Sequence, residues 1–123
     1  MRLQHTIKMN KELKYVDYSS EEGVVFRVIE TQMGQSDQGM EYVFNTYPDE
    51  IFDVCMSNIR LGLEKKLDIV PILIFEDLDF LVELEKIDFE DCLDNAINHF
   101  IRYEMYEKCA ELENIKKLLQ LID

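Results

Sequence analysis

The stretch TYPDEIFDVCMSNIRLGLEKK, residues 46–66, is the point at which the hydrophobic period of the chain changes. Beyond Pro48, apolar residues recur at helical spacing and share one face: Phe52, Cys55, Met56, Ile59 and Leu63. Pro48 and Asp49 are suited to the first turn of a helix, where a missing N–H costs no hydrogen bond. The stretch therefore predicts a helix over residues 48–66.

The segments before this helix have the composition of β-strands. KYVDY at 14–18 and VVFRVIETQ at 24–32 are rich in β-branched and aromatic residues, and the Ser- and Glu-rich turn between them predicts a hairpin. A Gly-, Ser- and Asp-rich segment at 33–39 is predicted as a surface loop, and MEYVFNTY at 40–47 as a third strand. Residues 1–47 are therefore expected to be mainly an antiparallel β-meander.

Strand-like sequence returns after the helix. IVPILIF and FLVELE flank the acidic, turn-like step EDLD, so residues 67–86 are predicted to form a second β-hairpin. Pro71 is expected near the edge or the start of this hairpin, because proline cannot donate a ladder hydrogen bond. A helix that starts at Pro71 is the alternative.

Two apolar stripes at helical spacing occupy the C-terminal part of the chain. DFED at 88–91 has the form of a capping box. The first stripe follows it, and the second extends from Met105 to Ile122. Because the stripes meet near Tyr103-Glu104, residues 87–123 are predicted to form an antiparallel helical hairpin. The whole chain, residues 1–123, is thus predicted as a single α+β domain.

Composition narrows the class of protein. The chain has 123 residues, of which 47% are hydrophobic and 32% charged, as expected for a folded domain. Its net charge of -13 should repel nucleic acids and anionic membranes and attract basic protein surfaces. The sequence therefore predicts no direct nucleic-acid binding.

The cysteines and the apolar runs predict a cytoplasmic protein. Three widely spaced cysteines without a CxxC pair suggest neither a disulfide framework nor a zinc knuckle. The opening residues contain no signal-peptide core, and the longest uncharged apolar run, IVPILIF, is too short to span a bilayer. We therefore expect neither secretion nor membrane insertion.

Part of the predicted helical hairpin has a known pattern. Residues 97–115 contain two aliphatic positions, an acid, an aromatic-Glu pair, a small pair and a leucine, in the order Ile97, Ile101, Glu104, Tyr106-Glu107, Cys109-Ala110 and Leu112. This order resembles the UVR motif, the helical hairpin of excision-repair subunits B and C and of bacterial unfoldase and kinase-adaptor proteins. The sequence departs from the motif at Phe100, where a small residue is usual, and at Glu113-Asn114, which replaces Arg-Asp. The resemblance implies association with another protein, hairpin to hairpin.

Three residue patterns could carry chemistry, and each has a plainer interpretation. Pro48-Asp49 with Glu64-Lys65-Lys66 fits the PD…ExK pattern of metal-dependent nucleases, but that site needs its ExK on a strand. Cys92 and His99 share a helix face, with Cys109 across the hairpin, yet a zinc site lacks a fourth ligand. The acids between 76 and 94 lack a DxDxDG loop for a hard cation. The sequence predicts no catalytic residue, metal or cofactor, and a small metal-dependent enzyme remains a further alternative.

The pattern favours a non-enzymatic adaptor or regulator that binds a protein with a basic or helical docking surface. The predicted contact residues are Tyr103, Tyr106, Glu107, Glu111 and Glu113, because aromatics supply contact area and acids supply steering. An acidic surface is predicted from Glu76, Asp77, Asp79, Glu83, Glu85, Glu90, Asp91 and Asp94. Homodimerisation through the same hairpin fits equally well.

A nucleic-acid-mimicking inhibitor is the alternative function. Carboxylates at helical spacing lie about 5 to 6 Å apart, which is close to the spacing of phosphates. Small acidic accessory proteins of phages and mobile elements use such surfaces to occupy DNA- or RNA-binding proteins. The size and charge of this chain suit that role.

Overall fold

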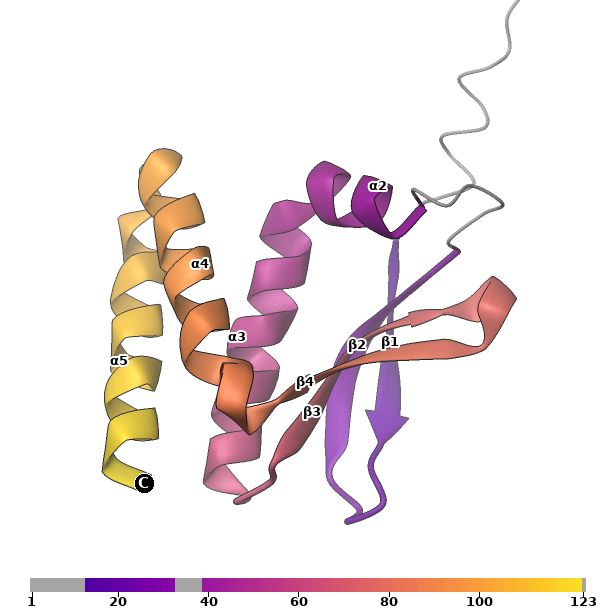
Figure 1. The fold of residues 1–123 in the computed structure, drawn as a ribbon, viewed down its shortest axis with the longest axis horizontal. Helices are drawn as coiled ribbons and strands as arrows, with labels where there is room; N and C mark the ends of the chain where they lie inside the picture. The colour runs from indigo at the N-terminus through magenta and orange to yellow at the C-terminus, as the bar shows by residue number, and fades with distance from the viewer. Residues whose placement is uncertain (1–12, 33–38, 123) are drawn as a thin grey trace, which may run out of the picture.

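The computed structural model describes residues 13–32 and 39–122 and has an α+β fold (Figure 1). The strands of the described chain are β1 (Lys14–Ser19), β2 (Val25–Thr31), β3 (Ile69–Phe75) and β4 (Phe80–Glu85). Its helices are α2 (Gly39–Thr46), α3 (Pro48–Glu64), α4 (Phe89–Arg102) and α5 (Tyr106–Ile122), with 3-10 turns η1 (Glu76–Leu78) and η2 (Lys86–Asp88).

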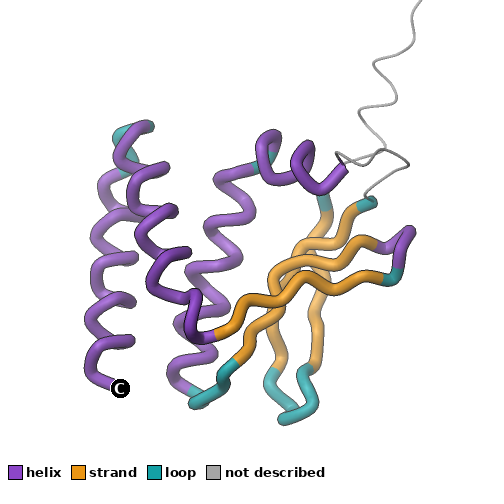
Figure 2. Tube along the Cα trace, in the orientation of Figure 1, coloured by secondary structure: helices purple, strands orange, loops and turns teal. Residues whose placement is uncertain are grey.

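The strands form one mixed sheet in the order β1-β2-β3-β4 (Figure 2). β1 and β2 are an antiparallel hairpin, as are β3 and β4, and the parallel pair β2–β3 joins the two hairpins. Parallel neighbours need a long crossover connection, and here it contains α2 and α3. The helix α3 lies against β2 and β3, while α4 and α5 pack against α3 on the side away from the sheet (Figure 1).

Most of the predicted elements are confirmed. The helix predicted over residues 48–66 is α3, and residues 67–86 form a β-hairpin, so the alternative helix starting at Pro71 is wrong. The C-terminal helical hairpin is present, with its turn at Tyr103–Met105. Pro71 is the third residue of an interior strand, and the pairing of β3 with β4 shifts register just after it.

The predicted third strand at 40–47 is wrong, because this segment forms the helix α2. Its aromatic and β-branched residues suggested a strand, but they bury one helical face on which Val43 is fully enclosed. The amide of Tyr47 still donates to the carbonyl of Val43, 3.0 Å away. A residue before proline disfavours helical backbone angles, so Pro48 separates α2 from α3. Most of the predicted loop at 33–39 lies outside the described residues.

The capping-box interpretation of Asp88 is also wrong, although a helix does begin at Phe89. Within the described chain, the Asp88 side chain accepts no capping hydrogen bond. The 3-10 turn η2 leads directly into α4, and the amide of Phe89 donates to the carbonyl of Lys86. Backbone geometry, not a side-chain cap, therefore starts this helix.

A buried asparagine links α3 to both hairpins of the sheet. Asn58 is 2% exposed, and its Nδ2 donates to the carbonyl of Arg27 in β2 at 3.0 Å and to that of Pro71 in β3 at 2.7 Å. In the described strands, β2 pairs with β3 over Ile29–Thr31 and Leu73–Phe75. Arg27 and Pro71 lie just before this ladder, where Pro71 has no N–H to extend it. The Asn58 amide supplies donors at this place.

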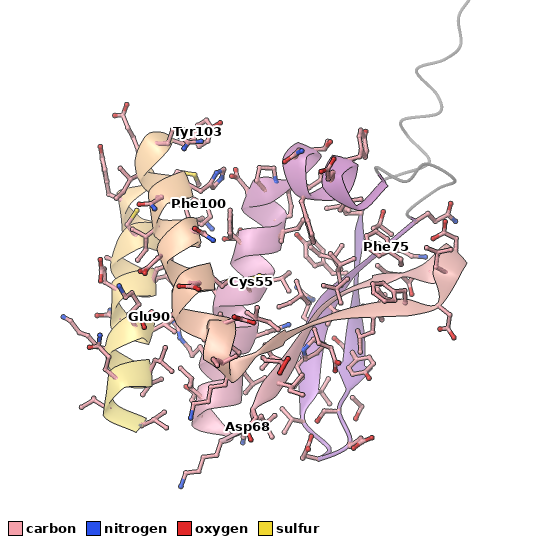
Figure 3. The ribbon with its side chains drawn as sticks, viewed as in Figure 1. Cys55, Asp68, Phe75, Glu90, Phe100 and Tyr103 are labelled. Carbon is pink, nitrogen blue, oxygen red and sulfur yellow. The ribbon has the colours of Figure 1, made fainter. Side chains whose placement is uncertain are left out.

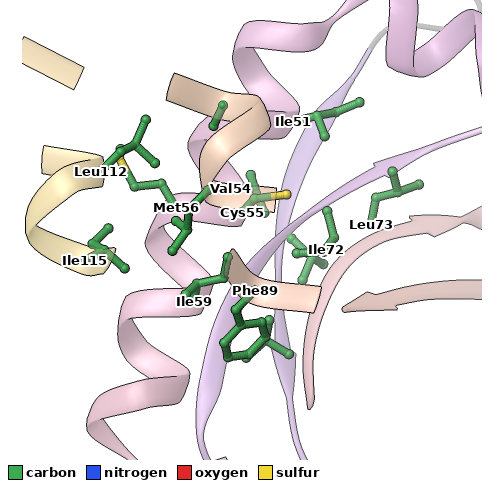
Figure 4. Packing of buried hydrophobic residues seen from close by; sticks show 14 of the residues in the cluster. Ile51, Val54, Cys55, Met56, Ile59, Ile72, Leu73, Phe89, Leu112 and Ile115 are labelled. Carbon is green, nitrogen blue, oxygen red and sulfur yellow. The ribbon is translucent and has the colours of Figure 1, made fainter. Parts of the chain in front are cut away.

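The core continues from the sheet through α3 to the helical hairpin. Figure 4 shows Met56 and Ile59 of α3 facing Leu112 and Ile115 of α5, while Cys55 points away from α5. The helix α3 lies close to β3 at Gly62, where an added Cβ would lie 2.5 Å from Cγ1 of the buried Val70. Any larger residue at this position would force Val70 or its surroundings to shift.

The turn between α4 and α5 is a Schellman motif without glycine. The amide of Glu104 donates to the carbonyl of Ile101 at 3.0 Å, and that of Met105 donates to the carbonyl of Phe100 at 2.8 Å. This motif needs a left-handed residue after the helix end, and Glu104 supplies it with a φ of 59°. A side chain in this conformation costs roughly 1 kcal/mol relative to glycine.

Replacing Asn58 with Leu should lower the free energy of unfolding by about 2–4 kcal/mol, because it leaves two carbonyls without a donor in the interior. Leucine has the same number of side-chain heavy atoms and the same branching as asparagine, but it has no polar group. Asn95→Leu, on the exposed face of α4, is the matched control and should change stability by less than about 0.5 kcal/mol. Urea unfolding monitored by circular dichroism measures both, and equal losses would show that the Asn58 bridge contributes nothing.

Glu104→Gly should stabilise the fold by about 0.5–1 kcal/mol, since glycine adopts the left-handed conformation without a Cβ clash. Glu107→Gly removes the same charge from the first turn of α5 and should instead destabilise by about 0.5–1 kcal/mol, because glycine is a poor helix former and an acid is favoured near a helix N-terminus. Thermal unfolding of the two variants gives the sign directly. A lower melting temperature for Glu104→Gly would contradict the strain at this turn.

Candidate functional site

The candidate site is a pocket of about 530 Å³ between the first half of α3 and α4, and two cysteines, a histidine, an arginine and a tyrosine line it. The segment before α3 closes one side of it. Its lining residues are Phe44, Asn45, Pro48, Ile51, Phe52, Cys55, Cys92, His99, Arg102 and Tyr103. Figure 3 shows Tyr103 at the end of α4 that meets the hairpin turn, and Glu90 toward the other end. The pocket therefore opens beside the tip of the hairpin.

His99 is the centre of an aromatic cluster at this pocket. Its side chain is 10% exposed, and its ring centroid lies 5.2 Å from that of Phe52 and 5.0 Å from those of Phe100 and Tyr103. The Nε2 of His99 donates to Oδ1 of Asp49 at 2.5 Å. Asp49 is in the first turn of α3 and His99 in the last turns of α4, so this hydrogen bond ties the two helices together.

Two cysteines meet at the other end of the pocket. The thiol of Cys55 in α3 is hydrogen-bonded to Cys92 in α4. This hydrogen bond, together with burial, raises the pKa of the Cys55 thiol well above its ordinary value. The same bond lowers the pKa of Cys92, because a donated proton stabilises the thiolate. The arrangement makes Cys92 the stronger nucleophile of the pair.

Sequence spacing predicts only part of this site. It places Cys92 on one helix face with His99, and the structure does bring these two residues to one pocket. Cys109, which the spacing puts across the hairpin, lies elsewhere, with its Sγ 3.8 Å from the carbonyl of Ile97 inside the hairpin. The sequence predicts Cys55 only as a core residue of a helix face, because no local pattern reveals which residue of another helix it meets.

The predicted contact residues lie around the hairpin turn and along α5. Tyr103 and Tyr106 are each 61% exposed, and Glu107, Glu111 and Glu113 are exposed too. Tyr103 also lines the pocket, whereas Glu111 turns toward α3 and lies 3.8 Å from Nη2 of Arg60. The tyrosines and Glu107 therefore surround one tip, and Glu113 lies further along the helix.

The predicted acidic surface is divided between two places. Glu76, Asp77 and Asp79 lie at the turn between β3 and β4, at the far end of the sheet from α4 (Figure 1). The remaining members lie on β4, which contributes Glu83 and Glu85, and on α4, which contributes Glu90, Asp91 and Asp94.

Some of these acids have a basic partner. Glu76 is 3.6 Å from Nζ of Lys14, and Asp94 is 2.7 Å from Nζ of Lys116. The hydrogen bond that Lys116 donates to Asp94 raises the pKa of Lys116. The surface is therefore not one continuous anionic face.

The metal patterns gain no support from the geometry. Pro48-Asp49 and Glu64 lie at opposite ends of α3, roughly 24 Å apart at 1.5 Å per residue. In the described residues, no group of three His, Cys, Asp or Glu side chains could hold a metal ion. A larger hollow, of about 740 Å³, lies near Tyr18, Lys66 and Glu83, and neither histidine nor cysteine lines its described walls.

No helix in the described part of the chain has the length and apolar character needed to cross a membrane. No protein-family model, curated protein or solved structure matches this chain. The resemblance of residues 97–115 to the UVR motif therefore stays a prediction.

His99→Ala should lower the free energy of unfolding by about 1–3 kcal/mol, because three aromatic neighbours lose a packing partner. His99→Phe keeps that packing and should lose less than half as much. Asp49→Asn, which removes the partly exposed charge alone, should cost under about 1 kcal/mol. Urea denaturation of the three variants separates the contributions. A loss for Asp49→Asn equal to that for His99→Ala would assign the stability to the charge of Asp49 and not to the aromatic contacts.

Proposed function

We propose that this protein is a non-enzymatic interaction module that binds a protein partner through the tip of its C-terminal helical hairpin. The observation that carries the proposal is the pair of exposed tyrosines, Tyr103 and Tyr106, on either side of the Glu104 turn. Ile101 adds a further exposed apolar side chain at the same tip. Aromatic side chains grouped in this way are typical of residues that dominate binding energy.

The hairpin supports binding because its orientation on α3 is held from several sides. The Nζ of Lys108 in α5 lies 2.5 Å from Oδ1 of Asp53 and also lies over the ring of Phe100. His99 holds the end of α4 to the start of α3. A preorganised surface loses little conformational entropy when it binds. The tip therefore presents its tyrosines where two fixed helices meet, with Tyr103 in the short turn and Tyr106 at the first position of α5.

The charges near the tip favour a basic partner. Glu104 and Glu107 are exposed beside the two tyrosines, and the chain as a whole carries a net charge of -13. Complementary charge speeds association and selects among partners. The resemblance to the UVR motif adds support for a helical partner, including a second copy of the same hairpin. Cytoplasmic action fits this function, since Cys55, Cys92 and Cys109 are all free thiols.

The nucleic-acid-mimic hypothesis draws less support from the arrangement of the acids. A mimic needs a continuous row of exposed carboxylates, whereas the acids here lie on two separate parts of the molecule. Asp94, moreover, is neutralised locally by Lys116. The salt dependence of partner binding distinguishes the two functions, because a mimic should bind mainly through long-range charge.

The test is a pull-down of the full chain from bacterial extract at low and high salt, with and without duplex DNA, followed by mass spectrometry. A partner captured in high salt and in the presence of DNA is then titrated against variants. Tyr103→Ala combined with Tyr106→Ala should weaken its affinity by about tenfold or more, since each exposed aromatic anchor contributes about 1–2 kcal/mol.

The matched control is Glu83→Gln combined with Glu85→Gln on β4, which changes exposed residues far from the tip in the chain. This control should reduce affinity by less than about threefold through weaker steering. Capture only in low salt and without DNA would contradict docking at the tip and favour the mimic, and so would a partner that tolerates the tyrosine changes but not the β4 changes.

A further inference from the structure

Cys55 and Cys92 bring two thiols together on neighbouring helices. The pair lines the pocket described above, so a small molecule in the pocket can reach it. Cys92 is half-buried, whereas Cys55 is enclosed in the core at 7% exposure. The two thiols therefore differ in access, because both line the pocket but Cys92 is more exposed than Cys55.

The difference in exposure assigns the two thiols different roles, because a molecule in the pocket reaches Cys92 more easily than Cys55. The interaction between the two thiols supports this assignment, since it lowers the pKa of Cys92 and raises that of Cys55. A thiolate, and not a thiol, attacks a disulfide. The less accessible thiol is then in contact with the sulfur of any adduct formed on its neighbour. This is the division into an attacking and a resolving cysteine.

We propose that Cys55 and Cys92 are a redox-active dithiol that low-molecular-weight disulfides of the glutathione class oxidise to an intramolecular disulfide. The Cys92 thiolate attacks one sulfur of the small disulfide, its S–S bond breaks, and the first thiolate leaves. Cys55 gives its proton to that leaving thiolate and attacks the Cys92 sulfur, which releases the second small thiolate. Two protein thiols are oxidised and one small disulfide is reduced to two thiols.

The bond would connect α3 to α4 across one wall of the pocket. These helices already meet through His99 and Asp49 near the tip, so oxidation adds a covalent link further along the same interface. Such a link restricts the unfolded chain and raises the melting temperature if it forms without strain. The proposal does not depend on a protein partner and stands apart from docking at the hairpin tip.

The test treats the full chain, in its reduced form, with oxidised glutathione and identifies the products by peptide mass spectrometry without reduction. The wild type and Cys109→Ala should lose two hydrogens and show a Cys55–Cys92 linked peptide. Cys55→Ala should stop at a mixed disulfide of glutathione on Cys92. Cys92→Ala should react at the remaining pocket cysteine about tenfold or more slowly, because that thiol is buried.

Circular dichroism establishes that each variant is folded. Cys55→Ala removes a buried side chain and can fail to fold for that reason. In that case the products of Cys109→Ala decide between the outcomes. Glutathione trapped on Cys92 of Cys109→Ala without a linked peptide would overturn the resolving role of Cys55. Both pocket cysteines remaining reduced while Cys109 of the wild type reacts would overturn the dithiol altogether.

Discussion

The hydrogen bonds of Asn58 hold together two halves of a sheet that pair over a short length. Each hairpin forms locally, but the hairpins are joined by a parallel ladder at Ile29–Thr31 and Leu73–Phe75. Pro71 cannot extend that ladder toward Arg27, because proline has no amide hydrogen. The Asn58 side chain bonds the carbonyls of both residues and thereby fixes the position of α3 against both strands. Gly62 then allows the helix to lie close to β3.

The position of α3 on the sheet in turn determines where the C-terminal hairpin, α4 and α5, packs on its other side. The outer face of the helix presents Asp49, Asp53 and Arg60 to the C-terminal hairpin, where they meet His99, Lys108 and Glu111. Exposed ion pairs of this kind contribute little stability individually, so the buried contacts of α3 with Leu112 and Ile115 supply most of the packing energy. The charged pairs select the orientation of the hairpin, and the pocket between α3 and α4 is the result.

Local patterns predicted the elements whose determinants are local. The change of period at Pro48, the acidic turn before β4 and the two stripes of the C-terminal hairpin each identify an element from its own residues. The strand predicted at 40–47 is wrong because aromatic and β-branched residues favour strands in general, whereas here they cover one face of the short helix α2. The parallel pairing of β2 with β3 and the bridge from Asn58 depend on segments far apart in the chain, which a single sequence cannot bring together.

The candidate site, too, could be predicted only where its residues are close together in the sequence. Exposed tyrosines near a predicted turn could be found from spacing, and the structure does leave Tyr103 and Tyr106 exposed there. The contact of Cys55 with Cys92 could not, because it depends on the rotation of α3 about its axis and on the position of α4. Helix spacing put Cys92 and His99 on one face, but only packing against α3 supplies Asp49 to the histidine and a second thiol to the cysteine.

The residues at positive φ connect the fold with the proposed docking surface. Lys66 and Glu104 occupy the same place in two helix-ending turns, where glycine would be more stable. At the end of α3, Lys66 follows Lys65, and cations are favoured near a helix C-terminus. Glu104 has the opposite charge at the equivalent position after α4, but it also lies just before the N-terminus of α5, where the helix dipole favours an acid. The backbone conformation still favours glycine there. The turn thus keeps an acidic side chain between two exposed tyrosines, which is what the proposed contact with a basic partner requires.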